Sequence, residues 1–404
     1  MGLNDRPISP RAAGLRVSLT QIASAIALAF VLATGCAVAL AAAPDDDWQG
    51  VKRIVAVADV HGDYDNYIRV LEEAGVINRR GRWSAGETHF VQLGDVPDRG
   101  ADTDRIIAHL RKLEEQARRD GGRVHLLIGN HEAMNISGDL RYVHAGEYRA
   151  LQTRRSAALR DAYFEQVREY VEGLDDGPEV DEAWRDKWFE EHPLGYVEHR
   201  QHWHPSGEFG SWVIEHNAVL RINRTLFVHG GLSPAVLHLS IREINEQVRE
   251  ELASEAREGL IVAEDGPLWY RGLADNNETE EMAAHVQALL DTYDADRIVV
   301  GHTPGFGTII PRYDARVLAA DSGIGAYYGS HLASLLIEGD RLFTVHQGER
   351  VELPASDEGR VDYLKAIDAI EPGINNLQAL IRSLEATPVE ATPAAEQKQT
   401  APEG

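Results

Sequence analysis

Cysteine is almost absent from this sequence of 404 residues, which contains only Cys36. Because Cys36 lies in an apolar N-terminal segment, residues 44–404 offer no thiol nucleophile, no disulfide bond and no thiolate ligand for a metal ion. A mechanism that depends on a catalytic cysteine is therefore excluded for that part of the chain.

Positive charge is also scarce, since 40 Lys and Arg residues stand against 65 Asp and Glu residues, which gives a formal net charge of -25. A field of that sign repels the phosphates of nucleic acids, so we expect no nucleic-acid partner. An anionic substrate would need a local positive site, which bound cations and arginines could supply. The hydrophobic fraction of 43% fits a globular protein with one or two domains.

Long apolar runs are confined to residues 22–43, which follow a polar leader that contains three arginines. This pattern predicts a secretory signal with cleavage after Ala43, and hence a protein exported to the periplasm or the cell envelope. Two alternatives keep residues 1–43 as a membrane anchor. The run is long enough to span a bilayer uncleaved, and the sequence before Cys36 resembles a bacterial lipobox. We expect contact with a membrane only through this segment.

Short β-branched runs recur along the chain, and each ends in Gly, Asp or His. They cover residues 53–63, 89–95, 123–132, 225–231, 297–304 and 317–323. Helical patterns at 64–73 and 102–118 separate the first three runs, and a Gly-Asp turn within 332–346 indicates a hairpin. Strands that alternate with helices predict an α/β fold in which ligand-bearing residues lie at the carboxyl ends of the strands.

Residues 139–215 have a different character, because they are rich in charged and aromatic residues. Helical patterns cover 147–172 and 180–191, and a β pattern returns only at 210–216. We interpret the stretch as a helical insertion that caps the site, and a surface elaboration is the alternative. The spacing of its four histidines could chelate a metal ion, but no carboxylate or cysteine pattern accompanies them. These are His192, His199, His202 and His204.

The boundaries of the domains follow from these patterns. We expect a catalytic domain over residues 51–350 that includes the insertion, and a C-terminal extension over 351–384. A second helical pattern covers 240–257 within the catalytic domain. Residues 385–404 are rich in Ala, Thr, Pro, Glu and Gln and predict a disordered tail.

Carboxylate, amide and imidazole groups follow the predicted strands in five motifs. They are Asp59 and His61 in ADVHGD, Asp95, Asp98 and Arg99 in GDVPDRG, Asn130, His131 and Glu132 in GNHE, His229 in VHGG, and His302 in GHTP. Two divalent cations about 3.5–4 Å apart need a bridging carboxylate and neutral imidazoles. Mixed oxygen and nitrogen ligands favour Mn, Fe or Zn. The motifs therefore predict a two-metal centre that could activate water and cleave a phosphoester.

In this order the motifs resemble those of the calcineurin-like metallophosphoesterase superfamily. More narrowly they resemble the phosphoprotein phosphatase family, whose pattern is GDxHG, GDxVDRG, GNHE, HGG and a late His. Ala58 and Pro97 depart from that pattern, and the last His lies in GHTP. These variants, with LWYRG at 268–272 and the N-terminal segment, are most similar to the bacterial Shewanella-like phosphatase branch. The resemblance implies a layered α/β sandwich of two central β-sheets flanked by helices, with a mostly helical insertion.

The resemblance also implies a role for each motif residue. The metal ligands would be Asp59 and His61 for the first ion, Asp95 as the bridge, and Asn130, His229 and His302 for the second ion. His131 would be the general acid that protonates the leaving group, kept protonated by Asp98. Arg99 would clamp the phosphate, and Arg271 is a candidate for a second clamp. Manganese is the metal that we expect first, ahead of iron and zinc.

The leading hypothesis is a two-metal phosphatase that hydrolyses phosphate monoesters on Ser/Thr or Tyr side chains of proteins, or on small molecules. Hydroxide supplied by the metal pair would attack the phosphorus directly. Two alternatives stay open: a nucleotide phosphoesterase similar to diadenosine tetraphosphate hydrolases, and a non-catalytic binding module that metals stabilise.

Three further features lie near the motifs in the sequence. Asp321 could support a metal-binding histidine or form a plain turn. Glu132 is expected to orient the backbone rather than to titrate. Three tyrosines could form a recognition wall, namely Tyr142, Tyr148 and Tyr196.

Overall fold

The computed structural model describes residues 45–175, 177–275 and 278–386. The predictions for residues 1–43 and for 387–404 lie outside these ranges. No helix within them is long and apolar enough to cross a membrane.

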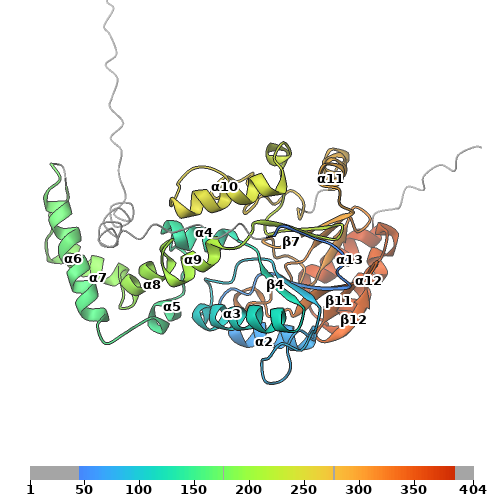
Figure 1. Cartoon of the computed structure of the whole chain (residues 1–404), viewed down its shortest axis with the longest axis horizontal. Helices are drawn as coiled ribbons and strands as arrows, with labels where there is room; N and C mark the ends of the chain where they lie inside the picture. Colours follow the sequence, from blue (N-terminus) through green and yellow to red (C-terminus); the bar gives the residue numbers. More distant parts are fainter. Residues whose placement is uncertain (1–44, 176, 276–277, 387–404) are drawn as a thin grey trace, which may run out of the picture.

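Two six-stranded sheets lie at the centre of the molecule (Figure 1). The first has the order β12-β11-β10-β2-β3-β4, in which β2, β3 and β4 are parallel and β10 pairs antiparallel with β2. Its strands are β2 (Arg53–Val57), β3 (His89–Gln92), β4 (Arg123–Leu126), β10 (Ala333–Glu338), β11 (Arg341–His346) and β12 (Glu349–Glu352). The pair β10–β11 confirms the predicted hairpin.

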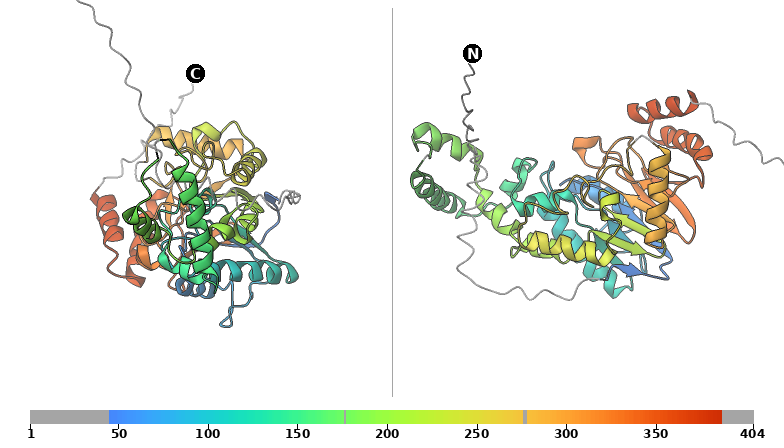
Figure 2. Two further views of the ribbon diagram at one scale, coloured as in Figure 1. Left: turned by 90° about the vertical axis from the view of Figure 1, so that its left-hand side faces the viewer. Right: turned by 90° about the horizontal axis from the view of Figure 1, so that it is seen from above.

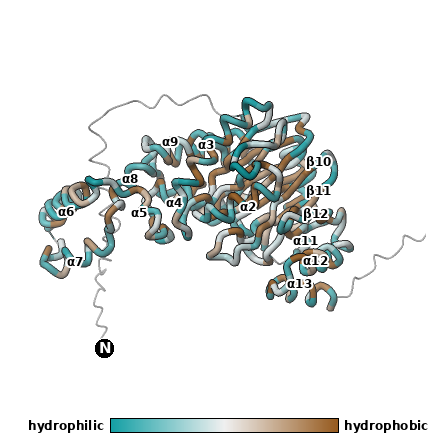
Figure 3. The backbone as a smooth tube through the Cα atoms, turned by 90° about the horizontal axis from the view of Figure 1, so that it is seen from below, coloured by the Kyte–Doolittle hydropathy of each residue, from teal (hydrophilic) through white to brown (hydrophobic). Residues whose placement is uncertain are grey.

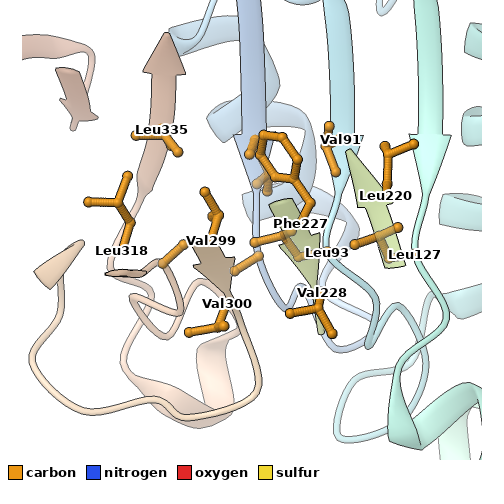
Figure 4. Close-up of a cluster of buried hydrophobic side chains, with 14 of the residues drawn as sticks. Val91, Leu93, Leu127, Leu220, Phe227, Val228, Val299, Val300, Leu318 and Leu335 are labelled. Carbon is orange, nitrogen blue, oxygen red and sulfur yellow. The ribbon is translucent and has the colours of Figure 1, made fainter. Parts of the chain in front are cut away.

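The second sheet has the order β1-β5-β6-β7-β9-β8. Its strands are β1 (Asp47–Trp48), β5 (Val219–Ile222), β6 (Thr225–Val228), β7 (Arg297–Val300), β8 (Ile310–Arg312) and β9 (Val317–Ala319). The strands β6, β7 and β9 are parallel. The sheets pack face to face, and Figure 4 shows side chains such as Val91, Phe227 and Val299 filling the space between them. Because both faces of these strands are buried, they read in the sequence as continuous apolar runs.

Helices cover the outer faces of both sheets (Figure 1). The first sheet carries α2 (Tyr64–Glu73) and α3 (Thr103–Arg119), and the second carries α10 (Ile241–Ala253) and α11 (Glu280–Thr292). In α3 the buried Ile106, Leu110 and Leu113 recur at helical spacing on the face toward the sheet. This arrangement confirms the predicted layered α/β fold.

The insertion is helical, as predicted, but its details differ from the prediction. Its helices are α5 (Ala145–Ala150), α6 (Ser156–Glu172), α7 (Glu182–Glu191), α8 (Tyr196–Trp203) and α9 (Glu208–Ile214). The single helix expected over 147–172 is two helices, because Thr153 and Ser156 bond to nearby backbone N–H groups in place of helical bonds. The β pattern expected at 210–216 is wrong, because Phe209, Trp212 and Val213 are buried at helical spacing in α9.

The helices α6 and α7 project from the body as an arm (Figures 1 and 2). The arm has a small core of its own, formed by Tyr163, Phe164, Val167, Val171 and Trp188, separate from the main core. Figure 3 shows the contrast between the apolar strands of the body and the mostly hydrophilic arm.

The C-terminal part contains α12 (Arg360–Ile370) and α13 (Asn375–Ala386), which pack against each other. Short 3₁₀ helices complete the fold: η1 (Pro234–Val236), η2 (Ala326–Tyr328) and η3 (Asp357–Gly359). Residues 385 and 386, which we expected in the tail, still belong to α13. The helix predicted over 240–257 is α10, and Ser240 with Glu243 forms the capping box at its start.

Candidate metal centre

The five motifs meet at one edge of the sandwich, because each follows a parallel strand. Asp59 follows β2, Asp95 follows β3, His229 follows β6 and His302 follows β7. Asn130 begins the short helix α4 (Asn130–Ser137), which follows β4 after a short loop. The carboxyl ends of parallel strands lie at the same edge of a sheet, so two facing sheets bring all five side chains together. Each of them is at least 96% buried.

Asp95 lies in the middle of this cluster. Its Oδ2 atom is 3.8 Å from Nε2 of His61 and 3.8 Å from Nε2 of His131, and its Oδ1 atom is 3.2 Å from Nε2 of His229. The Oδ1 atom of Asn130 is 3.0 Å from the same His229 nitrogen. A carboxylate that faces imidazoles on both sides is placed to bridge two cations.

Two groups of possible ligand atoms share Asp95. One comprises His61, Asp95 and His131, and the other comprises Asp95, His229 and His302. Asp59 adjoins the first group, with Oδ2 3.9 Å from Nε2 of His61. The four histidines of the insertion lie in neither group.

The histidines of the centre fit a metal ion by their hydrogen bonds. The Nδ1 atoms of His61 and His229 lie 3.1 Å and 2.7 Å from the backbone oxygens of Pro97 and Leu93. A proton held there leaves Nε2 free to ligate, and such contacts usually orient metal-binding histidines. The buried Nε2 atom of His302 has no hydrogen-bond partner in the part of the chain that the structure describes. A ligand role would satisfy it.

Burial and charge set the protonation of these rings. Burial lowers the pKa of His61 to about 3 and the pKa of His302 to about 2, so both rings are neutral, which is the form that binds metal. For His229, burial disfavours the charged ring, but the carboxylates of Asp95 and Asp59 outweigh it and raise the pKa to about 10. A divalent cation would displace that proton.

The backbone of the motifs is held in an unusual conformation. Five residues with side chains have positive φ angles, which non-glycine residues rarely adopt. They are His61 at 45°, Asp95 at 51°, Asp98 at 72°, Arg99 at 64° and His302 at 65°. Such strain persists only where surrounding contacts hold it, and it concentrates at functional sites.

Glu132 supplies part of that support. Its carboxylate accepts hydrogen bonds from the backbone N–H groups of Asp95, Val96 and Gly129, at 3.0, 2.8 and 2.8 Å. This geometry agrees with the predicted role in orienting the backbone. Gly129 must be a glycine, because a Cβ atom there would lie 2.3 Å from Oδ1 of Asp95.

His131 and Asp98 form a buried pair beside the cluster. The Nδ1 atom of His131 is 2.5 Å from Oδ2 of Asp98, and Asn135 donates to the other oxygen of Asp98 at 3.0 Å. Burial opposes a charge on His131, but the carboxylates of Asp95 and Asp98 outweigh it and raise its pKa. A raised pKa favours the protonated ring that a general acid needs.

The guanidinium of Arg99 lies between two aromatic rings, 3.9 Å from the centroid of Tyr142 and 4.6 Å from that of Tyr327. The ring of Tyr142 also lies 5.2 Å from that of His131. Of the three tyrosines in the predicted wall, Tyr142 alone has such contacts, while Tyr148 and Tyr196 pair with each other inside the insertion. Sequence reasoning missed Tyr327, because no motif marks η2.

Two further residues lie near the centre. Arg271 donates to the backbone oxygen of His302 at 2.8 Å and to Oγ1 of Thr303 at 3.1 Å. Its role as a second clamp stays a prediction. Asp321 accepts a hydrogen bond from the N–H of Gly323 at 3.0 Å, as in a turn, and it also contacts Asp59. Its support of a metal-binding histidine stays a prediction. Burial and the charge of Asp95 raise the pKa of Asp321 to about 6.

Comparison with known proteins decides the family. Residues 52–306 match the calcineurin-like phosphoesterases. The chain belongs to this family. As a calcineurin-like phosphoesterase it is a metal-dependent phosphoester hydrolase that binds divalent metal ions, and its buried ligand clusters could hold them.

Individual relatives refine this placement. An uncharacterised protein of Schizosaccharomyces pombe is 33% identical over 70% of this chain and 76% of its own length. Shewanella-like protein phosphatase 1 of Plasmodium berghei is 26% identical, over 63% of this chain and 62% of the relative. Shewanella-like protein phosphatase 2 of Arabidopsis thaliana is 28% identical, over 62% and 66%. The chain thus spans less than two thirds of these two phosphatases.

A solved structure gives the same placement. The cold-active protein-tyrosine phosphatase of a psychrophilic Shewanella species superposes with a TM-score of 0.59 and 29% identity, over 77% of this chain and 83% of the other. Together these relatives place the chain in the Shewanella-like branch.

Proposed function

We propose that this phosphoesterase is a phosphoprotein phosphatase that prefers phosphotyrosine to phosphoserine and phosphothreonine. The observation that carries the proposal is the position of Arg99 between the rings of Tyr142 and Tyr327, because the ring of Tyr142 also contacts His131. A phosphate held by Arg99 would bring an attached phenyl ring against these rings, where aromatic pairs are favourable. The structural relative named as a protein-tyrosine phosphatase gives further support.

The chemistry divides among a few groups. Two divalent ions, held by Asp59, His61, Asp95, Asn130, His229 and His302, would supply a hydroxide nucleophile near neutral pH and offset the charge of the phosphate. Arg99 would bind two phosphate oxygens with its planar fork. His131 would donate the proton on Nε2 to the leaving oxygen, while Asp98 at Nδ1 keeps the ring charged and oriented.

A substrate panel tests the proposal. Purified residues 44–404 with added Mn²⁺ would be assayed on a phosphotyrosine peptide, a phosphothreonine peptide of the same sequence and diadenosine tetraphosphate. We expect the highest kcat/KM on the phosphotyrosine peptide. Preference for diadenosine tetraphosphate would instead identify a nucleotide phosphoesterase, and no turnover of any substrate would favour the non-catalytic binding module.

Removing the ring of Tyr142 should reveal the source of the preference. We expect Tyr142→Ala to lower kcat/KM on the phosphotyrosine peptide by roughly threefold to tenfold, the range of one aromatic contact. The phosphothreonine peptide should be affected less, and Tyr142→Phe should stay close to the wild type because it keeps the ring. The exposed Tyr170 provides a control through Tyr170→Ala. Equal losses on both peptides would refute a role for Tyr142 in selectivity.

A further inference from the structure

The insertion reaches the helix that carries the proposed general acid. This helix, α4, bears Asn130 and His131 in its first turn and is buried along almost its whole length. The last turn of a helix leaves backbone oxygens without intrahelical partners, and burial makes it necessary to satisfy them. At this point α8 of the insertion packs against α4.

Arg200 of α8 donates hydrogen bonds to the backbone oxygens at the end of α4. Its Nη1 atom donates to the backbone oxygen of Asn135, and its Nη2 atom donates to that of Ile136 at 3.1 Å. The side chain is 12% exposed, and its Nη2 atom also lies 3.9 Å from the carboxylate of Glu255. A positive charge at the carboxyl end of a helix also interacts favourably with the helix dipole. Arg200 therefore fixes the end of α4 from outside the helix.

The fixed residue Asn135 is in turn bonded to the catalytic pair. Its Nδ2 atom donates to Oδ1 of Asp98 at 3.0 Å and to the backbone oxygen of His131 at 2.9 Å. Asp98 then holds Nδ1 of His131. A continuous path of hydrogen bonds thus runs from Arg200 through Asn135 and Asp98 to the ring of His131.

The helix α8, which carries Arg200, also contacts the projecting arm. Tyr196, in the first turn of α8, stacks on Tyr163 of α6 with ring centroids 6.2 Å apart and packs against His192 at 4.5 Å. A second contact of the insertion is made by Tyr142, whose backbone oxygen accepts a hydrogen bond from the N–H of Arg99 at 3.1 Å. The insertion therefore contacts both the helix that carries His131 and the loop that carries Arg99.

We infer that Arg200 is a positioning residue for the His131–Asp98 pair, so that the insertion is part of the catalytic apparatus. The inference rests on the proposed role of His131 as the general acid. Arg200 touches neither substrate nor metal, and it acts through the orientation of Asn135. Its loss should therefore slow only those reactions in which the leaving group needs a well-placed proton.

Arg200→Met tests this in the full enzyme loaded with Mn²⁺. The substrates are phenyl phosphate, whose leaving group needs a proton, and p-nitrophenyl phosphate, whose leaving group does not. We expect kcat on phenyl phosphate to fall about tenfold, because a small displacement of a catalytic group slows proton transfer to the leaving group. The kcat on p-nitrophenyl phosphate, both KM values and the Mn²⁺ content should stay near the wild type. Arg200→Lys should restore part of the loss, because it keeps the charge and one donor but not the fork.

The matched control is Arg154→Met, at an exposed arginine of the same insertion. Equal losses of kcat on the two substrates, or no loss on either, would overturn the role of Arg200. If Arg200→Met does not fold, as judged by thermal unfolding, a folded Arg200→Lys without a selective loss on phenyl phosphate would overturn it as well. His131→Asn separates the two proposals. Equal losses of kcat on both substrates in His131→Asn would refute the role of His131 as the general acid. A selective loss on phenyl phosphate in His131→Asn, without one in Arg200→Met, would overturn only the inference about Arg200.

Discussion

Replacing Asp95 by Asn is expected to empty the centre of metal and to lower turnover by about a thousandfold. The substitution replaces one carboxylate oxygen by an NH2 group and removes one negative charge. Oδ1 of Asp95 accepts from the N–H of His131 at 3.0 Å, and the amide oxygen of Asn can accept the same bond. The fold of the loop should therefore survive. The change removes the only carboxylate shared by the two ligand groups of the described residues.

Metal content and turnover would be measured on the same dialysed sample, by elemental analysis and with p-nitrophenyl phosphate. Asp161→Asn serves as the control, because Asp161 is exposed on α6, away from the ligand groups. Normal metal content with normal turnover would exclude Asp95 from the centre. Full metal content with lost turnover would mean that Asp95 acts on the substrate and does not hold the ions.

The strands and the edge at which the ligands meet could be predicted from the sequence, because both depend on short stretches of neighbouring residues. A strand buried on both faces leaves a readable apolar run, and the residue that follows a parallel strand lies at the carboxyl edge. Asp59, Asp95, His229 and His302 all follow such runs. Their meeting at one edge therefore needed no knowledge of the loops.

The support around the centre could not be predicted in this way. Arg200 contacts Asn135 from 65 positions away, and Tyr327 contacts Arg99 from a 3₁₀ turn with no periodic pattern. Such contacts depend on how loops pack, and no spacing in the sequence encodes them. The error at α9 has the same cause, since a short run with a Trp and two β-branched residues fits either a strand or a helix until its packing partners are known.

Replacing His131 by Asn is expected to lower kcat on phenyl phosphate by about a hundredfold or more while the metal content stays normal. In the structure His131 differs from the proposed ligands because its Nδ1 atom is held by Asp98 at 2.5 Å, a carboxylate outside both ligand groups. His131 is nevertheless a member of the first group of possible ligand atoms, with its Nε2 atom 3.8 Å from Oδ2 of Asp95. Geometry alone thus allows His131 to be an acid or a ligand, and the variant separates the two roles.

A general acid matters in proportion to the basicity of the leaving group, because a weakly basic oxygen departs without a proton. The loss in His131→Asn should therefore be large with phenyl phosphate and small with p-nitrophenyl phosphate, at equal Mn²⁺ content. His238→Asn, at an exposed histidine, controls for the loss of an imidazole. A ligand would behave differently, since its removal lowers the metal content and slows both substrates alike. Equal losses with normal metal content would contradict both roles and would leave His131 as an electrostatic partner of the phosphate.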